Sequence, residues 1–207
     1  MIINALNELE LEINRPDPQR ILIEKPEQNA LVFNNLSIAK LSGEVLVSGI
    51  NERIRQGEHL LIKGDTASGS KLFKAIAGLW PWGSGSIELP DGEPMFFMSP
   101  RPYLPDGTLR AAICYPCLPE GCSLASLDDL FNLAGVGDLL GQLEQVDAWD
   151  KVLTREQQQR LGLVRLLLYA PKWVLIEEAF DSLSPDGGES MLRLICQQLP
   201  DATLIIL

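Results

Sequence analysis

Apolar residues along the chain fall into short strand-like runs and longer stretches with helical spacing. The short runs are bounded by polar, Gly- or Pro-containing turns, which is typical of strands. These runs occupy residues 30–33 (ALVF), 45–49 (VLVSG), 59–63 (HLLIK), 81–89, 93–98 and 173–176 (WVLI). An Asn-Asn pair after residue 33 predicts a turn. We expect residues 173–176 to form a central parallel strand beside the strand that ends at Lys63.

The helical stretches lie after residue 69 and through the second half of the chain. Leu72, Ile76 and Leu79 are spaced i, i+4, i+7, which predicts a helix over about residues 70–79 with Gly64–Gly69 wrapped around its N-terminus. A second apolar face, formed by Leu161, Val164 and Leu168, predicts another helix. Ser184-Pro185 fits an N-cap followed by proline at the first helical position, with Leu192, Ile195 and Leu199 on one stripe.

The order of these elements indicates an α/β domain. Residues 1–28 are polar and broken by prolines, so we assign them to a linker or tail. Residues 29–207 then form one domain, in which a β-rich start and a final strand–helix–strand unit flank a helical region at about residues 105–170. A chain of 207 residues is long enough to form a hydrophobic core that is stable without disulfides or bound metals.

Charge and composition limit the kinds of partner that the chain is expected to bind. The chain has 17 Lys and Arg against 28 Asp and Glu, a formal net charge of −11, which argues against nucleic acid as the main partner. It has no apolar run near the ~20 residues that a spanning helix needs, and its N-terminus lacks a signal-peptide pattern.

Three of the four cysteines lie close together in CYPCLPEGC, at Cys114, Cys117 and Cys122. A structural zinc site needs four ligands, and the one histidine, His59, lies in an apolar run far along the chain. We therefore expect reduced, unpaired thiols with no zinc and no obligatory disulfide.

The string GDTASGSKL follows the run at 59–63 and leads into the predicted helix. A phosphate-binding loop has the pattern G-x-x-x-x-G-K-[ST], in which backbone amides surround phosphates and the lysine reaches the β- and γ-phosphates. Gly64 and Gly69 have this spacing, but Ser70-Lys71 follows where Lys-Ser is required. The motif is therefore incomplete. Lys71 replaces the lost lysine only if its flexible stem curls back, because one residue is a turn of ~100° along a helix.

The longer string GDTASGSKLFKAIAGLWPWGSG resembles the Walker A region of ATP-binding cassette (ABC) transporters. The Gly-Leu-Trp-Pro-Trp-Gly run is similar to the branch with fused permease and ATPase, which handles fatty acyl groups, vitamin B12 or peptides. The resemblance covers about residues 28–207. It implies a P-loop NTPase (RecA-like) core with an antiparallel β subdomain and a helical subdomain. It also implies ATP and Mg²⁺ as cofactors, a membrane permease as partner, a head-to-tail cassette dimer and a place at the cytoplasmic face of the membrane.

Site residues follow from the same resemblance. Glu178 matches the catalytic carboxylate, while Ser70 and Glu177 correspond to the groups that support Mg²⁺. Thr154 and Glu156 fall in the signature segment that faces the partner cassette's nucleotide. The nucleotide-binding loop corresponds to Gly64, Asp65, Thr66, Ala67, Ser68, Gly69, Ser70, Lys71 and Leu72.

Departures from the family pattern leave two functions open. The loop lysine is missing, the Q-loop glutamine corresponds to Pro100, Glu156 replaces the signature glycine, and Glu177 replaces an aspartate. No aromatic residue stands near residues 37–41, where the family stacks adenine, and Trp80, Trp82 and Trp173 are interpreted as packing residues. The chain stops before the family's switch histidine. It is either a transporter ATPase subunit with a degenerate site, or a non-hydrolysing pseudo-cassette or gene fragment acting at most as an interaction module.

Overall fold

A computed structural model describes residues 20–26, 28–92, 94–116, 124–180 and 183–207. The chain divides into two compact units, which are described separately below. The first contains residues up to Ile54 together with Asp65–Asp91, and the second contains Arg55–Gly64 together with Gly92–Leu207.

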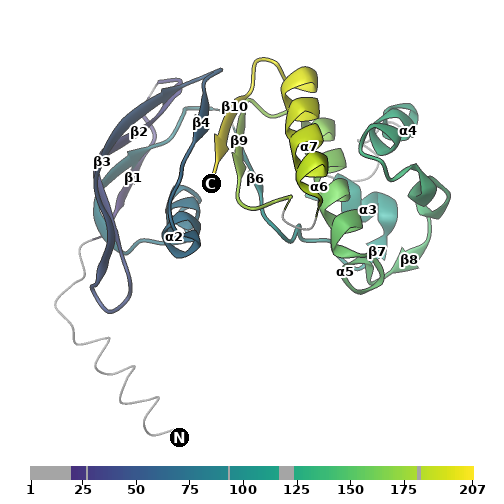
Figure 1. Cartoon of the computed structure of the whole chain (residues 1–207), viewed down its shortest axis with the longest axis horizontal. Coiled ribbons are helices and arrows are strands. Elements are labelled where there is room, and N and C mark those ends of the chain that lie inside the picture. Colours follow the sequence, from purple (N-terminus) through teal and green to yellow (C-terminus); the bar gives the residue numbers. More distant parts are fainter. Residues whose placement is uncertain (1–19, 27, 93, 117–123, 181–182) are drawn as a thin grey trace, which may run out of the picture. The chain divides into compact units, whose positions relative to one another are not determined.

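The first unit is a four-stranded sheet with one helix against it (Figure 1). The sheet has the order β1-β5-β2-β3, in which β5 pairs parallel with β1 and antiparallel with β2. Helix α2 (Thr66–Ile76) buries Leu72, Phe73 and Ile76. The strands are β1 (Leu22–Glu24), β2 (Ala30–Ala39), β3 (Val45–Arg55) and β5 (Gly83–Glu88).

Two features of this sheet differ from the predictions. β1 lies within the stretch assigned to a linker, because residues 22–24 pair with β5. The turn predicted at Asn34-Asn35 is wrong: β2 continues through these residues with a register shift, and Asn35 has φ +46°. Leu36 and Ile38 beyond the irregularity are fully buried, so the strand remains on the core instead of turning away from it.

The second unit contains a parallel sheet of order β4-β10-β9-β6. β9 (Trp173–Ile176) is an interior strand, as predicted. The prediction that it lies beside the strand ending at Lys63 is wrong, because β10 (Thr203–Ile206) separates it from β4 (His59–Leu61). β10 pairs with strands on both sides and β6 (Met95–Met98) flanks β9, so the buried C-terminal apolar run takes the position that we gave to β4.

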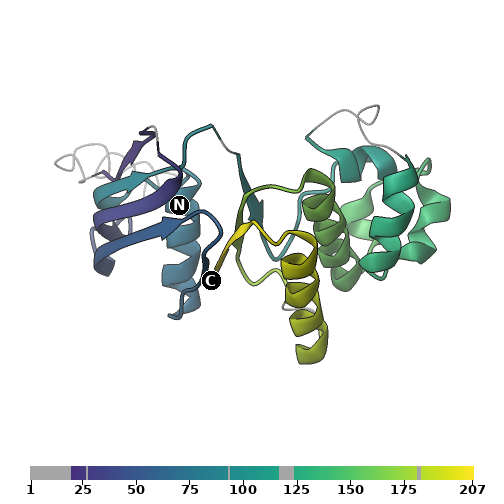
Figure 2. The same ribbon diagram turned by 90° about the horizontal axis from the view of Figure 1, so that it is seen from above.

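Helices occupy most of residues 105–170, as predicted. The longest of them, α6 (Arg155–Tyr169), contacts α3, α4, α7 and β6, and it runs beside α7 (Pro185–Gln198) in Figure 2. Leu161 and Val164 on its predicted apolar face are fully buried. The remaining elements are β7 (Gly107–Thr108), α3 (Leu109–Cys114), α4 (Leu124–Leu133), the 3₁₀ helix η2 (Gly137–Gln142), β8 (Val146–Asp147) and α5 (Trp149–Val152).

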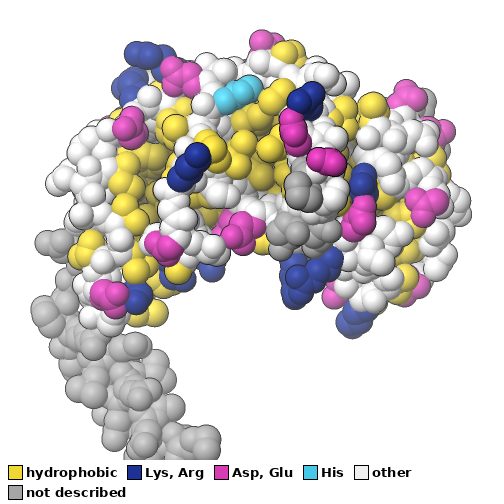
Figure 3. Space-filling view, viewed as in Figure 1, with side chains coloured by type: hydrophobic (Ala, Val, Ile, Leu, Met, Phe, Trp, Pro, Cys, Tyr) yellow, Lys and Arg dark blue, Asp and Glu magenta, His cyan; other side chains and the backbone are white. Residues whose placement is uncertain are grey.

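The positions of the cysteines and of the histidine bear on the expectation of unpaired thiols without zinc. Cys114 is buried at the end of α3 and is disulfide-bonded, so the expectation of unpaired thiols is wrong for this residue. Cys117 and Cys122 lie outside the described residues, and Cys196 is free. His59, the cyan side chain in Figure 3, is exposed.

No helix in the described residues is long and apolar enough to cross a membrane.

Candidate functional site

The predicted phosphate loop is largely helical in the structure. α2 begins at Thr66 and ends at Ile76, so the predicted helix over 70–79 begins too late and ends too late. Asp65 is the N-cap: its Oδ1 accepts a hydrogen bond from the backbone N–H of Ser68 at 2.9 Å. An aspartate N-cap is among the strongest helix starts, and residues 66–68 contain no breaker, so the helix forms where a wider loop was expected.

The first turn of α2 therefore holds a carboxylate at its positive end. Hydrogen bonds from the side chain and backbone of Ser68 lower the pKa of the exposed Asp65 carboxyl. The backbone N–H of Gly69 donates to the Asp65 carbonyl at 3.0 Å, as expected inside a helix. These two amides are among those that a phosphate loop would turn towards its ligand. The turn in its present form offers fewer free donors than a complete phosphate loop.

Lys71 contacts an aromatic ring. Its Nζ lies 4.5 Å from the centroid of the Trp80 ring, which is a cation–π contact. The Trp80 indole is itself held in place, because its Nε1 donates to the carbonyl of Ala39 at 2.9 Å. Lys71 is thus engaged by Trp80, while its neighbours Ser70 and Leu72 are half-buried and buried respectively.

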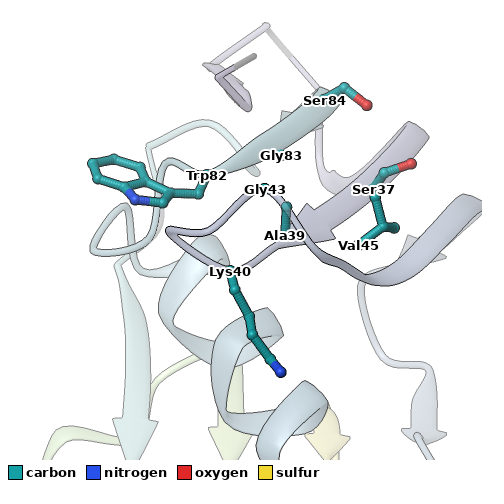
Figure 4. A pocket seen from close by; sticks show the side chains of 8 residues that line it. All are labelled: Ser37, Ala39, Lys40, Gly43, Val45, Trp82, Gly83 and Ser84. Carbon is teal, nitrogen blue, oxygen red and sulfur yellow. The ribbon is translucent and has the colours of Figure 1, made fainter. Parts of the chain in front are cut away.

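A pocket of about 240 Å³ lies in the same unit, beside residues 37–45 (Figure 4). Trp82 lines it, and the Trp80 and Trp82 ring centroids are 6.1 Å apart. The sequence has no aromatic residue at 37–41, but pairing of β2 with β5 brings this tryptophan pair next to that segment. In this pairing Ile38 lies opposite Gly83, the residue after Trp82, so the end of β2 lies beside the tryptophan pair. Figure 4 shows the Trp82 ring and the Lys40 side chain extending away from Ser37 and Ser84.

The signature segment begins helix α6 in the second unit. Thr154 is the N-cap: its hydroxyl accepts from the N–H of Gln157 at 3.2 Å, and the Gln157 side chain accepts from the N–H of Thr154 at 3.0 Å. This reciprocal pair is a capping box. Glu156, exposed in the first turn, forms an ion pair with Arg160 at 2.9 Å. The segment is thus a well-formed helix start, and both candidate residues are at the surface.

Replacing Thr154 with alanine should lower the free energy of unfolding by about 1 kcal/mol, because the first turn loses its capping acceptor. Chemical denaturation followed by circular dichroism measures this change. Thr154→Ser keeps the hydroxyl and is the matched control, with an expected change within a few tenths of a kcal/mol. Equal losses in the two variants would show that the threonine methyl group, rather than the cap, carries the effect.

Glu177 and Glu178 follow β9 at its carboxyl end. The N–H of Glu177 donates to the carbonyl of Met98 at 2.9 Å, which fixes this end of β9 against the end of β6. Glu177 is half-buried and Glu178 is exposed. Glu178 has φ +43°, a left-handed conformation that is unusual for a residue with a Cβ. Such strain of ~1–3 kcal/mol is concentrated at functional sites, which agrees with Glu178 as the candidate catalytic residue.

A buried side chain joins the signature helix to the segment after β6. Gln159 is 1% exposed, and its Nε2 donates to the carbonyl of Pro100 at 3.3 Å. The second unit therefore brings the glutamates, the Pro100 segment and α6 to one region of its fold. Sequence reasoning missed Gln159, although a polar residue on the apolar side of a helix is a recognisable signal.

The predicted loop and the predicted carboxylates belong to different units. Asp65–Leu72 lies in the first unit, while Gly64, Thr154, Glu156, Glu177 and Glu178 lie in the second. Hydroxyl and carboxylate oxygens are suitable ligands for Mg²⁺, so the chemistry of Ser70 and Glu177 fits the ion. Their joint role remains a prediction. Within the described ranges, no group of three or more His, Cys, Asp or Glu side chains could hold a metal.

Comparisons with known proteins show which proteins the chain resembles. No family model matches the chain. It is 35% identical over 84% of its length to an uncharacterised ABC transporter ATP-binding protein of Haemophilus influenzae, of which it covers 30%. It is 33% identical over 84% of its length to the human lysosomal cobalamin transporter ABCD4, of which it covers 31%. The chain therefore spans about a third of the length of these curated relatives.

The structure of a bacterial Atm1-family ABC exporter with ATP bound matches the fold over 100% of this chain and 39% of that one, with a TM-score of 0.71 and 17% identity. This match confirms the predicted α/β fold with its P-loop NTPase core. This chain is thus a homologue of the ABC transporter ATP-binding proteins, with relatives in their D subfamily.

Proposed function

We propose that this chain is the ATP-binding cassette of an ABC transporter whose nucleotide site is degenerate. It couples nucleotide binding to a membrane permease at the cytoplasmic face of the membrane, in a head-to-tail pair of cassettes. The names of its homologues support this role. The transported substrate is left open, because the chain spans only part of each relative.

The position of Lys71 is the main observation that supports a degenerate nucleotide site. A cassette needs a cation at the β- and γ-phosphates, and this lysine is held against Trp80. Its charge-assisted contact with a phosphate would be worth ~1.5–3 kcal/mol. Asp65 adds a carboxylate at the helix end that a phosphate would approach. These two features support weak nucleotide binding.

The remaining residues have the roles that the resemblance implies. Glu178 is the residue that would orient and deprotonate the attacking water, and Ser70 and Glu177 are the residues that would hold Mg²⁺ and its water shell. The ion, when bound, neutralises charge on the phosphates during phosphoryl transfer. Thr154 and Glu156 face the nucleotide of the partner cassette, where the Glu156 carboxylate repels a polyphosphate. Phosphoryl transfer depends on these parts as a unit, so loss of one removes much of the rate.

A non-hydrolysing cassette is the second candidate, and the Glu156–Arg160 ion pair favours it. This pair holds a bulky carboxylate in the first turn of the signature helix, where the family has a glycine that approaches phosphate. In this reading, the chain acts only through contact with a partner. Measurable ATP binding favours the first candidate, and its absence favours the second.

We expect purified chain to hydrolyse ATP at a rate near background, and Glu178→Gln to leave that rate unchanged. Phosphate release with and without Mg²⁺ measures turnover, and fluorescence titration with a nucleotide analogue measures binding. Glu189→Gln on α7, whose carboxylate is exposed and paired with Arg193, is the matched control. A rate typical of active cassettes that Glu178→Gln abolishes and Glu189→Gln preserves would contradict the degenerate site.

A further inference from the structure

A second pocket of about 240 Å³ lies in the second unit, between the end of β6, the segment that follows it and helix α6. Phe96, Phe97 and Tyr103 contribute apolar or aromatic wall. Arg165 of α6 and the exposed Arg101 are the cationic residues that line it. The pocket therefore combines apolar surface with positive charge, and the nucleotide-binding role uses none of these side chains.

Arg165 is buried, and its hydrogen bonds to described residues go to carbonyl groups. It is 8% exposed, and its Nη2 donates to the carbonyls of Tyr103 (2.9 Å) and Ala112, whereas its buried Nε has no hydrogen-bond partner. The salt bridges among the described residues do not include Arg165. Burial lowers the pKa of this guanidinium, which nevertheless stays charged at neutral pH. Burial of a guanidinium that pairs with no carboxylate of the described residues is unfavourable, so the pocket favours an anion.

The guanidinium is held in one place by its surroundings. It lies 5.9 Å from the Tyr115 ring, and Tyr115 packs edge-on against Tyr103 with ring centroids 5.2 Å apart. Together with the two carbonyl acceptors, these rings restrict the side chain. Because the Arg165 side chain is already held in one conformation, an anion that binds it causes little further loss of conformational entropy. This preorganisation increases the affinity for the anion.

We propose that this pocket binds a small monocarboxylate with a short hydrocarbon chain. The carboxylate pairs with the guanidinium of Arg165, and the hydrocarbon lies against Phe96 and Phe97. None of the predicted nucleotide-binding residues lines the pocket, and the proposal does not depend on the proposed function.

Gly162 gives the means to close the pocket without touching its charge. It lines the cavity, and a Cβ at this position would meet Pro102 and Met98 at ordinary contact distances of 3.6 to 3.7 Å. A leucine at 162 therefore begins without a clash, and its outer atoms occupy the cavity. Gly162→Leu tests the space, whereas Arg165→Met tests the charge.

Butyrate is the probe, and butanamide is its neutral counterpart of the same shape. We expect sodium butyrate, but not butanamide or sodium chloride at equal concentration, to raise the melting temperature of the full chain by roughly 3–5 °C at ten times its dissociation constant. That constant should be about 1–10 mM. Saturation-transfer NMR on butyrate gives a direct reading. The response should disappear in Arg165→Met and in Gly162→Leu.

Arg193→Met is the matched control, because it removes the same charge from an exposed position on α7 and should keep the full response. Equal effects of butyrate and butanamide would overturn the proposal, as would a full butyrate response in Arg165→Met. If Arg165→Met does not fold, Gly162→Leu decides alone: loss of the response supports the site, and an unchanged response overturns it.

Discussion

A lysine inserted between Gly69 and Ser70 should raise the affinity for ATP by roughly 10- to 100-fold, the equivalent of one charge-assisted contact of ~1.5–3 kcal/mol. The insertion restores the order Gly-Lys-Ser of a complete phosphate loop. Leu72, Phe73 and Ile76 anchor the rest of α2 in the core, so the extra residue is expected to be absorbed on the N-terminal side. The first turn, held there by Asp65, would then open into a loop.

Insertion of methionine at the same place is the matched control, because it lengthens the loop by the same amount without a charge. Equilibrium titration of the two variants with ATP and Mg²⁺ separates the contributions. Equal gains for lysine and methionine would show that loop length, and not the missing charge, limits binding. Neither insertion should restore turnover, since Pro100 and Glu156 remain in place.

A local signal in the sequence predicted the start of helix α7 correctly. Ser184 caps α7, with Pro185 at its first position, because a serine hydroxyl satisfies an amide that the helix leaves free and proline has no amide to satisfy. Thr154 caps α6 in the same way, although its capping role was not predicted. Asp65 is the instructive exception. It is an equally good cap, but comparison with the complete phosphate loop led us to place the helix start later than the local chemistry does.

The order of the strands could not be predicted from local pattern. The runs at 173–176 and 203–206 are both apolar and both interior, so composition does not say which of them lies beside β4. Strand order in a parallel sheet is decided by how the connecting helices pack, which is a property of the whole unit. Likewise, Trp80 and Trp82 reach residues 37–45 only through the pairing of β2 with β5.

Arg165 was also missed, although the sequence carries a signal for it. It is flanked by Val164 and Leu166 in the most apolar part of α6, where a charged residue requires polar partners. Helical periodicity alone would treat it as an exception to the apolar face. The acceptors are the carbonyls of Tyr103 and Ala112, 62 and 53 residues away in the sequence, so only the fold identifies them.

Trp149→Ala should lower the free energy of unfolding by about 3–5 kcal/mol, the usual range for a buried tryptophan. Trp149 begins α5 and is 0% exposed. Its Nε1 donates to the carbonyl of Gly107 in β7 at 2.8 Å, so the substitution removes a hydrogen bond as well as packing. α5 ends two residues before the Thr154 cap, and the loss should therefore also loosen the start of the signature helix.

Val152→Ala is the matched control, because Val152 is in the same short helix but is 53% exposed, and its change should stay within about 0.5 kcal/mol. Trp149→Phe keeps most of the packing and removes the indole donor. We expect it to lie between the other two, with a loss of about 1–3 kcal/mol from the unsatisfied Gly107 carbonyl. Urea denaturation measures all three. If Trp149→Ala costs less than about 1 kcal/mol, then α5 does not anchor the signature helix to the core, and the cap at Thr154 holds that end of α6 by itself.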